Sequence, residues 1–422
     1  MNLYPHKKFL FAIERFNLVK ENDKILVAVS GGPDSTSCLL NLKAIEKDKN
    51  LKLYAIYIDH GLREDVEEDK KFVRDLCEKL NIPLFIEKIE IKRKGSVEEK
   101  ARKERIKIFE KYLKKYNFDK IATGHNLNDV IETLLFRILR GGFGEKIIGI
   151  SPLEGNFIRP LILTTKEENI SYLKKLGVNY RIDITNFDFK ITRNFIRYKI
   201  VPLFKEIFPD FEKGFLKTYI SFYEQRDFIK KHIENIYKEN LYMKGKNFFV
   251  LKMPEISDYE VSELSNYIFQ KFEKNKSINF YQKEEIKKIY KKGNGRVSLS
   301  KDIFLEISMG YFSIFKEIKL KRKEKIKKGI LKWEPLGIKI KINENIGGFL
   351  RNWEEGDYII INRKKKKMKK IFNEFKIPRF LRKVIPVIAK NKKILWSYPS
   401  IFSDELKKTK NSVKIIEIKN ET

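Results

Sequence analysis

Cysteine is scarce in this sequence, since only Cys38 and Cys77 occur among its 422 residues. Two cysteines so far apart exclude a disulfide framework and a Cys-x-x-Cys metal or redox site. No apolar run approaches the roughly 18–20 residues that a membrane-spanning helix needs. Residues 1–24 alternate charged with apolar side chains and lack the continuous apolar stretch of a signal peptide. These absences predict a soluble protein in a reducing, cytoplasmic setting.

Acidic residues are few relative to basic ones. The sequence has 57 Asp and Glu residues against 90 Lys and Arg residues, which gives a formal net charge of +33. This excess favours a nucleic-acid partner, because each cation that neutralises a phosphate releases a condensed counterion. An AT-biased genome, which also enriches Lys, Ile, Asn, Phe and Tyr, is the alternative explanation. A hydrophobic content of 42% with 13% aromatic residues argues against a disordered chain.

The first half of the chain alternates short apolar strands with amphipathic helices. The pattern predicts strands over residues 24–29, 53–59, 84–91 and 120–123, and helices over residues 35–47, 64–80, 96–116 and 128–139. Such alternation is typical of parallel βαβ units, so we expect an α/β fold with a doubly wound, mostly parallel sheet. Ligands of such sheets bind beyond the carboxyl ends of the strands.

The alternation stops after Pro202, and the rest of the chain has a different character. Residues 210–292 have apolar residues at helical spacing, and residues 330–422 mix short strands with a helix. Between them, the highly charged residues 319–328 predict a linker or a solvated helix end. A length of 422 residues suggests two or three domains at roughly 150 residues each. We therefore expect a first domain over 1–205, a helical domain over 206–328 and a small α+β domain over 329–422.

The first predicted strand runs into the loop Ser30-Gly31-Gly32-Pro33-Asp34-Ser35. Successive glycines allow backbone N–H groups to surround an anion, and the N-terminus of the following helix adds a positive partial charge. The loop has no lysine, so it is not a Walker A loop, and it does not match the dinucleotide pattern Gly-x-Gly-x-x-Gly. The pattern predicts a phosphate-binding loop, with a tight connection that binds nothing as the alternative.

Two other predicted strands also end in polar residues. The second strand ends in Asp59-His60-Gly61-Leu62-Arg63, and the fourth is followed by His125, Asp129 and Glu132 at spacings i, i+4 and i+7. If the helix begins by His125, these three side chains share one of its faces. The second strand thus brings an acid, Asp59, an imidazole, His60, and a cation, Arg63, to the expected ligand-binding edge of the sheet.

The loop resembles the signature of the PP-loop ATP pyrophosphatases, Ser-Gly-Gly-x-Asp-Ser. The larger set of motifs resembles the tRNA(Ile)-lysidine synthetase family within that superfamily. This set comprises Asp59–Arg63, Gly124–Thr133, Arg140–Gly144, Arg159-Pro160-Leu161, Asp183–Asp188 and Thr192–Arg197. Leu350-Arg351, Gly356-Asp357, residues 364–370 and Ile377–Pro386 resemble the C-terminal tRNA-binding domain of the same family. One position departs from the family pattern, since Asn128 occupies the place of the first acid of an Asp-Asp pair.

The resemblance implies an ATP-dependent ligase that modifies tRNA. ATP would adenylate the C2 oxygen of the wobble cytidine in a tRNA(Ile) with the anticodon CAU. The ε-amino group of L-lysine would then attack C2 and expel AMP, which forms lysidine and changes codon reading from AUG to AUA and identity from Met to Ile. The cofactors implied are ATP and Mg²⁺. The first domain would be catalytic, and the helical and C-terminal domains would bind tRNA.

The resemblance also assigns roles to individual residues. ATP and its pyrophosphate would be bound by Ser30, Gly31, Gly32, Pro33, Asp34, Ser35, Asp59, His60 and Arg102. Catalytic roles would fall to Asp34, His125 and Asp129, and Mg²⁺ would be held by Asp34 and Asp129. Lysine would be bound by Asp129 and Glu132, and tRNA or ATP would be contacted by Arg193, Asn194 and Arg197. Two plainer explanations remain open, Asp34 as a helix cap and Glu132 as a solvated helix residue.

Three rival functions share parts of this pattern. A PP-loop tRNA thiolase generally needs paired cysteines or an iron–sulfur cluster, and an amidating synthetase usually carries a glutaminase unit with a nucleophilic cysteine. A non-catalytic RNA-binding module on a degenerate PP-loop would have lost Asp34 or Asp129, and both are present. The sequence leaves the oligomeric state open, with a homodimer as one option.

Overall fold

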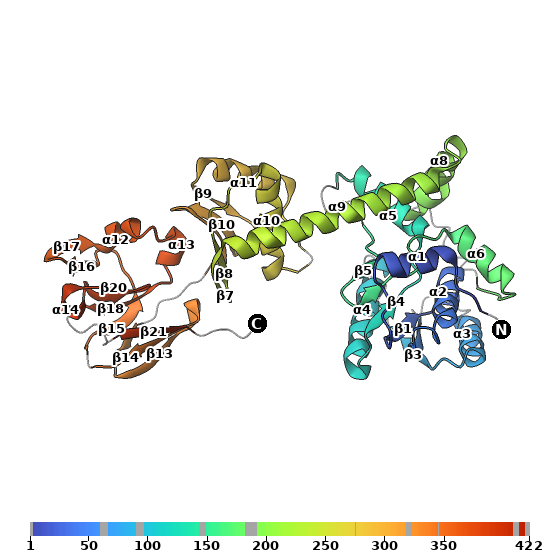
Figure 1. Cartoon of the computed structure of the whole chain (residues 1–422), viewed down its shortest axis with the longest axis horizontal. Helices are drawn as coiled ribbons and strands as arrows, with labels where there is room; N and C mark the ends of the chain where they lie inside the picture. The colour runs from blue at the N-terminus through green and yellow to red at the C-terminus, as the bar shows by residue number, and fades with distance from the viewer. Residues whose placement is uncertain are drawn as a thin grey trace. The chain divides into compact units, whose positions relative to one another are not determined.

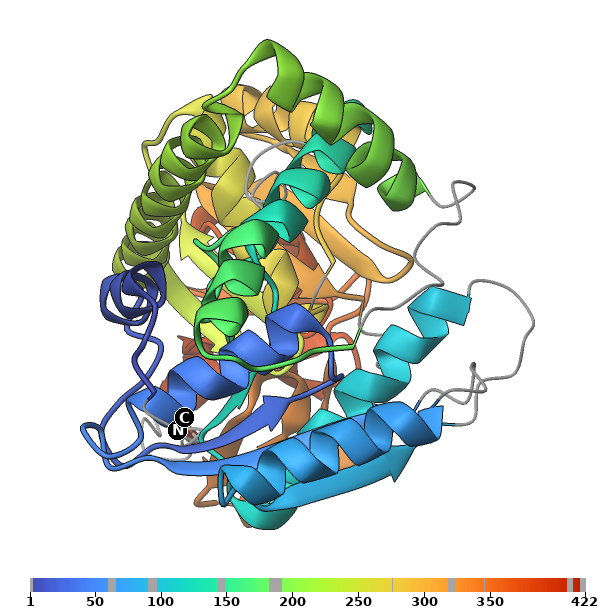
Figure 2. The same ribbon diagram turned by 90° about the vertical axis from the view of Figure 1, so that its right-hand side faces the viewer.

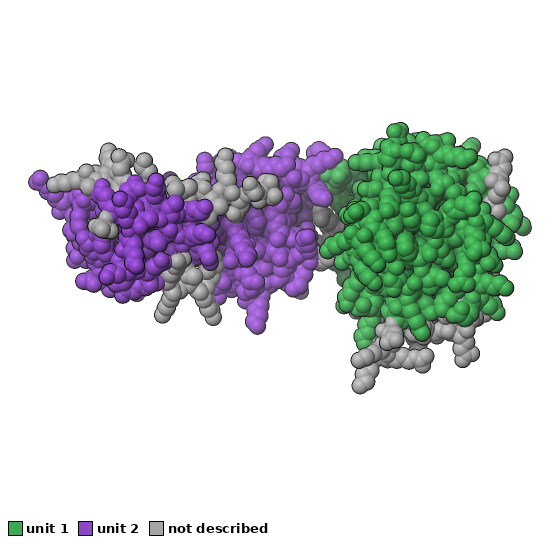
Figure 3. Space-filling model, turned by 90° about the horizontal axis from the view of Figure 1, so that it is seen from below, with its two compact units in different colours: residues 1–227 green, residues 228–422 purple. Residues whose placement is uncertain are grey.

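The computed structural model describes residues 3–59, 66–89, 97–142, 149–181, 192–274, 276–317, 323–344, 346–407 and 413–417. The chain divides into two compact units, Met1–Asp227 and Phe228–Thr422 (Figure 3). The three-domain division expected from the sequence is finer than this one and stays a prediction. None of the described helices is both long enough and apolar enough to cross a membrane.

The first unit is built on a six-stranded sheet in the order β3-β2-β1-β4-β6-β5 (Figure 1). Its strands are β1 (Lys24–Ala28), β2 (Lys52–Asp59), β3 (Leu84–Lys88), β4 (Lys120–Ala122), β5 (Leu153–Glu154) and β6 (Phe157–Ile158). All neighbours pair in parallel except the β5–β6 pair. The doubly wound, mostly parallel sheet is confirmed. Because β2 and β4 lie on opposite sides of β1, the strand order reverses there, and ligands bind at such a switch point.

Helices cover both faces of this sheet. The helices of this unit are α1 (Lys7–Arg15), α2 (Pro33–Ala44), α3 (Val66–Lys79), α4 (Val97–Tyr116), α5 (Leu127–Leu139), α6 (Lys166–Lys175), α7 (Thr192–Phe195), α8 (Val201–Ile207) and the first part of α9 (Phe211–Asn240), with a π-helical turn at Ile196–Ile200. The later part of α9 belongs to the second unit, where Ile233, Ile236 and Tyr237 enter the core. Strand β1 alternates between two cores, because Ile25 and Val27 pack with α2 and α3, whereas Leu26 packs with α4. Figure 2 looks onto the face that α2 and α3 cover. Burial on both faces explains the continuous apolar run of β1.

The second unit begins with an antiparallel sheet in the order β7-β8-β11-β10-β9. Its strands are β7 (Leu241–Gly245), β8 (Phe248–Lys252), β9 (Gly295–Ser298), β10 (Ile303–Ser308) and β11 (Tyr311–Lys316), packed with α10 (Asp258–Phe272) and α11 (Phe280–Lys292). The expectation of helices throughout residues 210–292 is wrong for the β7–β8 hairpin. Phe248 and Val250 enter one core and Leu251 another, so β8 is apolar at successive positions and shows no strand alternation.

The rest of the second unit is the expected small α+β part. It has one sheet in the order β12-β15-β18-β19-β16-β17, with β20 beside β19, and a second sheet in the order β13-β14-β21. Its elements are β12 (Lys323–Lys325), β13 (Gly329–Trp333), a 3₁₀ turn (Glu334–Leu336), β14 (Ile338–Ile342), β15 (Phe349–Asn352), β16 (Tyr358–Ile361), β17 (Lys364–Lys367), α12 (Met368–Glu374), α13 (Arg379–Arg382), β18 (Pro386–Lys390), β19 (Lys393–Ser397), β20 (Ile401–Phe402), α14 (Asp404–Lys407) and β21 (Val413–Glu417). The linker or solvated helix end expected over residues 319–328 is wrong at β12, whose backbone pairs with β15 while its lysines stay exposed. Residues 319–322 of that range lie outside the described residues.

Candidate functional site

The loop after β1 is held closed by its own serines. The backbone N–H of Ser30 donates to Ser35 Oγ at 3.1 Å, and Ser35 Oγ donates to the Gly32 carbonyl at 3.1 Å. Gly31 adopts a left-handed φ of +83°, which a residue with a Cβ adopts only under strain. Gly32 is the N-cap of α2 and Pro33 its first residue, so the loop leads directly into a helix N-terminus. The predicted loop residues thus form one turn suited to bind a phosphate.

Gly124 brings the end of β4 against this turn. A Cβ on Gly124 would lie 2.8 Å from the backbone nitrogen of Ser35 and 2.9 Å from the carbonyl carbon of Asp34. Only glycine permits so close an approach between two backbones. The residues after β4, beginning with His125, therefore lie beside the N-terminus of α2.

Asp34 lies on the first turn of α2, and its Oδ1 accepts a hydrogen bond from Asn169 Nδ2 at 2.8 Å. Burial raises the pKa of Asp34 above its ordinary value, and the nearby charge of Asp129 raises it further. Hydrogen bonds from Asn169 and Asn126 oppose that rise in the pKa. The charge of Asp129 therefore acts on Asp34, and the switch point of the sheet carries two interacting carboxylates.

His125 precedes α5 rather than starting it. Asn126 is the N-cap, and its side chain and that of Asp129 form a capping box, with N–O distances of 3.1 and 3.0 Å. The condition for one shared face of His125, Asp129 and Glu132 is therefore not met, and only the two acids share the helix. Burial lowers the pKa of His125 to about 4, helped by the charges of three arginines and opposed by Asp129. The imidazole is neutral at neutral pH, and its Nδ1 lies 2.9 Å from Thr123 Oγ1.

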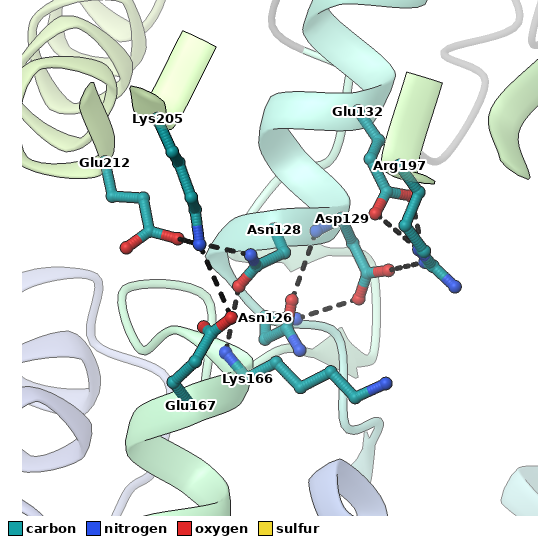
Figure 4. Close-up of polar contacts among 9 residues, drawn as sticks. All are labelled: Asn126, Asn128, Asp129, Glu132, Lys166, Glu167, Arg197, Lys205 and Glu212. Atoms are coloured by element: carbon teal, nitrogen blue, oxygen red, sulfur yellow. Dashed lines mark hydrogen bonds and ion pairs between the residues drawn. The ribbon is translucent and has the colours of Figure 1, made fainter. Parts of the chain in front are cut away.

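Arg197, from the π-helical turn Ile196–Ile200, lies against both acids of α5 (Figure 4). Its Nε donates to Glu132 Oε1 at 2.6 Å and its Nη2 to Glu132 Oε2 at 2.9 Å. The same Nη2 lies 3.3 Å from Asp129 Oδ1. Burial opposes the charge of Arg197, but the bonds and charges of the two acids raise its pKa above the ordinary value. Glu132 is only 4% exposed, so the structure contradicts the idea of a solvated helix residue.

Known proteins match both ends of the chain. The family model of the PP-loop domain matches residues 5–204, and that of the TilS substrate C-terminal domain matches residues 349–417. The tRNA(Ile)-lysidine synthase of Thermosipho africanus is 35% identical over 97% of this chain and 96% of its own length. That of Thermotoga maritima is 33% identical over 90% of this chain and 92% of its own length. The chain belongs to the tRNA(Ile)-lysidine synthase family.

The other site residues expected from the family pattern have diverse surroundings. Asp59 is buried at the end of β2, where Lys70 Nζ lies 3.0 Å from its Oδ2. Arg102 is exposed on α4, and its charge contributes to the low pKa of His125. Asn194 is half-buried on α7. His60 and the side chain of Arg193 lie outside the described residues.

Two residues beyond the expected family set also shape the loop. Asn169 of α6 is buried, accepts from Ser37 Oγ at 3.4 Å and donates to Asp34. Asn169 precedes the buried residues Tyr172 and Leu173 by three and four positions, so the three side chains share one face of α6. Because a buried amide needs hydrogen-bond partners, this spacing could have marked Asn169 in the sequence. Arg181 donates its backbone N–H to the Gly31 carbonyl at 2.9 Å.

The side chain of Arg181 connects the loop to α3. Its Nε lies 2.9 Å from Asp69 Oδ1, and its Nη2 lies 2.6 Å from Glu68 Oε2. Its Cγ would be 3.5 Å from a Cβ on Gly31, so the side chain also covers the loop. No spacing pattern links Arg181 to residues more than a hundred positions away, so the sequence offered no signal for it.

The donor set fits a magnesium ion shared with a nucleotide. Mg²⁺ is usually held by one or two carboxylates together with substrate phosphates, and Asp34 and Asp129 are two such carboxylates beside the loop. Among the described residues, no three or more His, Cys, Asp and Glu side chains form a cluster that could hold a metal.

Proposed function

We propose that this chain is a ligase that uses ATP to join lysine to C2 of the wobble cytidine, C34, of tRNA(Ile) with the anticodon CAU. AMP and pyrophosphate are released, and the tRNA changes from reading AUG to reading AUA. The observation that carries this proposal is the similarity to tRNA(Ile)-lysidine synthases over 97% of the chain. The geometry supports it, because the phosphate loop, two carboxylates and a neutral histidine lie at the switch point of the sheet.

The first step adenylates the tRNA. The C2 oxygen of C34 attacks the α-phosphorus of ATP, and the bond between that phosphorus and the bridging oxygen to the β-phosphate breaks. The leaving pyrophosphate carries the developing charge, which preorganised donors stabilise. We assign this role to the backbone N–H groups of Gly31 and Gly32 and the hydroxyl of Ser30. The hydroxyl of Ser35, which donates to the Gly32 carbonyl here, would join them once that bond is released. Arg181 holds the loop carbonyl of Gly31 and so fixes the direction of these groups.

Asp34 and Asp129 would hold Mg²⁺. The ion would supply positive charge beside the phosphates, where the carboxylates alone would repel them. The hydrogen bond from Asn169 orients Asp34, and the capping box orients Asp129.

His125 acts in this proposal as a hydrogen-bond donor. With a pKa of about 4 it is a weak base at neutral pH. In the tautomer whose Nδ1 accepts from Thr123, the Nε2–H group is left to donate, and we assign it to the α-phosphate.

The second step uses lysine as the nucleophile. The ε-ammonium group of lysine loses one proton to solvent, and the neutral amine then attacks C2 of the adenylated cytidine. The C2–O bond breaks, AMP leaves with that oxygen, and the new nitrogen substituent passes its surplus proton to N3 of the base or to solvent. We assign recognition of the lysine to Asp129 and Glu132. Arg197 already pairs with Glu132 and lies 3.3 Å from Asp129. The lysine ammonium would therefore share both carboxylates with this guanidinium, and Asp129 with Mg²⁺ as well.

The tRNA is held mainly through its phosphates. A net charge of +33 supplies the cations, and such contacts position the tRNA without reading its sequence. C34 must leave the anticodon stack to reach the phosphate loop, at a cost of only a few kcal/mol for an unpaired base. ATP, lysine and tRNA are all present in the cytoplasm, where we place the protein.

The decisive experiment measures incorporation of radiolabelled lysine into a CAU-anticodon tRNA(Ile) transcript with ATP and Mg²⁺. We expect incorporation that requires both ATP and C34, with a C34U transcript as the matched control. AMP release on tRNA without lysine incorporation would support the adenylation step but contradict the assignment of lysine as the nucleophile. A protein that binds tRNA but neither incorporates lysine nor releases AMP would contradict the proposed function.

A further inference from the structure

Asn128 contacts the N-terminal ends of two other helices with the two ends of its amide (Figure 4). Its Oδ1 accepts from the backbone N–H of Lys166, the first residue of α6, at 2.9 Å. Its Nδ2 donates to Glu212 Oε1, in the first turn of α9, at 3.3 Å. One side chain in the first turn of α5 therefore connects three helices.

The contact with α6 satisfies a donor that the helix cannot satisfy itself. The capping box of α6 uses the backbone N–H groups of Thr165 and Glu168, with distances of 2.9 and 3.1 Å. The N–H of Lys166 has no partner within its own helix, as is general for the first turn. Asn128 supplies that partner, and the N–H of Leu127 adds a bond to the Thr164 carbonyl at 2.8 Å. The starts of α5 and α6 are thus joined twice.

This junction lies between the carboxylates assigned to the reaction. Helix α6 carries Asn169, which holds Asp34. Helix α5 carries Asp129 and Glu132, one and four residues after Asn128. A shift of α5 against α6 would therefore change the separation of Asp34 from the two acids of α5.

The contact with α9 requires a neutral donor at position 128. Lys205 Nζ lies 2.7 Å from Glu212 Oε1 and 3.4 Å from Glu167 Oε1, so one ammonium already serves two carboxylates. A third carboxylate at position 128 would keep the bond to Lys166 but would face Glu212 without a proton to share. Like charges at this distance repel each other.

We propose that Asn128 and Glu212 form a matched positioning pair, with the amide donor on α5 and the carboxylate acceptor on α9, which keeps Asp129 and Glu132 in register with Asp34. The inference rests on the proposed function, because it assigns the pair a role in the lysine-transfer reaction. It differs from a direct role, in which position 128 would itself contact the metal or a substrate.

The test is a double-mutant cycle on the full chain. Asn128→Asp should lower kcat/KM for lysine roughly tenfold, because it removes the donor and adds repulsion. Adding Glu212→Gln restores a donor opposite the carboxylate, with the roles reversed, and should recover activity to within about threefold of the parent protein. Asn81→Asp, at an exposed turn of the same unit, adds the same charge elsewhere and should leave kcat/KM unchanged.

Three outcomes overturn the inference. They are full or increased activity of Asn128→Asp, failure of Glu212→Gln to restore it, and additive effects of the two changes on the free energy of unfolding. The last measurement applies even where a variant folds poorly, because only coupled residues give non-additive changes. Failure of the parent protein to incorporate lysine would instead contradict the proposed function, so the two failures are distinguishable.

Discussion

The PP-loop unit and the C-terminal unit each carry an aspartate of a family motif, but the two carboxylates have opposite kinds of partner. Asp34 accepts hydrogen bonds from the neutral amides of Asn169 and Asn126. The charge that raises its pKa is that of a second carboxylate, Asp129. Asp357 accepts from both terminal nitrogens of Arg351, at 2.8 and 2.9 Å, and from the backbone N–H of Glu354. The first carboxylate is left with excess negative charge, whereas the second is neutralised within the fold.

The difference extends to the other charged motif residues. In the first unit, Arg197 links two acids of the site and remains about one-third exposed. In the second unit, Arg351 is 5% exposed and also donates to two backbone carbonyls. Arg382 is likewise buried, where it donates to the Ile377 carbonyl and Asn373. Arg351 and Arg382 therefore stabilise the fold of this unit, whereas Arg379 of the same motif is exposed.

The largest expected effect is that of Asp34→Asn on chemistry. The substitution keeps an acceptor for Asn169 but removes the charge assigned to Mg²⁺, so AMP release on tRNA should fall roughly 10²–10³-fold. The check is a comparison of AMP release and tRNA affinity in the same preparation. Loss of tRNA binding in step with AMP release would contradict the assigned role.

The same variant should not lose stability. Burial raises the pKa of Asp34 above its ordinary 3.8, so the folded state holds the proton to higher pH than the unfolded state does. This group makes the protein less stable as the pH rises through that window. Asp34→Asn should therefore match or exceed the free energy of unfolding of the parent at pH 7, and the two should converge below pH 3.8.

Arg351→Met tests the opposite half of the comparison. It leaves Asp357 charged and unpaired in a site where its side chain has no exposed surface. Removal of one partner of a buried ion pair costs about 3–5 kcal/mol, so the second unit should unfold at clearly lower denaturant concentration. Adding Asp357→Asn removes the stranded charge and should recover a large part of that loss. An Arg351→Met protein of full stability and weaker tRNA binding would show that this arginine contacts RNA instead.

Local sequence patterns predicted β1 to β4 and α2 to α5 of the first unit, because each is recorded in consecutive residues. They did not predict α1, the short pair β5–β6, or α6 to α8. The strand predicted over residues 24–29 is β1 at Lys24–Ala28, and the loop Ser30–Ser35 lies where its glycines and serines indicated. Strand β8 of the hairpin could not be predicted, because an apolar run buried on both faces has no alternation. The predicted face of His125, Asp129 and Glu132 depended on where α5 begins, and the capping box of Asn126 places that start two residues after His125.

Contacts between distant residues were beyond the reach of these patterns. Arg197 pairs with Glu132 across 65 positions, and Asn169 meets Asp34 across 135 positions. Both pairs depend on how helices pack, and the side chains alone do not specify the partner. The sequence did single out Arg197, Glu132 and Asp34 as site candidates, but it assigned Arg197 to tRNA or ATP, whereas the structure places it against the acids assigned to lysine. Which ligand Arg197 serves stays a prediction.

The smallest expected effect concerns the exposed lysines of β17, which form a cationic edge strand in the C-terminal unit. Lys364 and Lys367 are exposed on this strand, so each can neutralise a phosphate without disturbing a core. Replacing either by glutamine should weaken tRNA binding only a few-fold and reduce the slope of log Kd against log salt by just under one. Lys52→Gln is the matched control, because Lys52 is exposed at the start of β2, at the edge of the sheet opposite the phosphate loop. If Lys52→Gln changes the slope of log Kd against log salt as much as the β17 variants do, tRNA binding depends on the total charge of the protein. The exposed lysines of the second unit would then have no special role in binding tRNA.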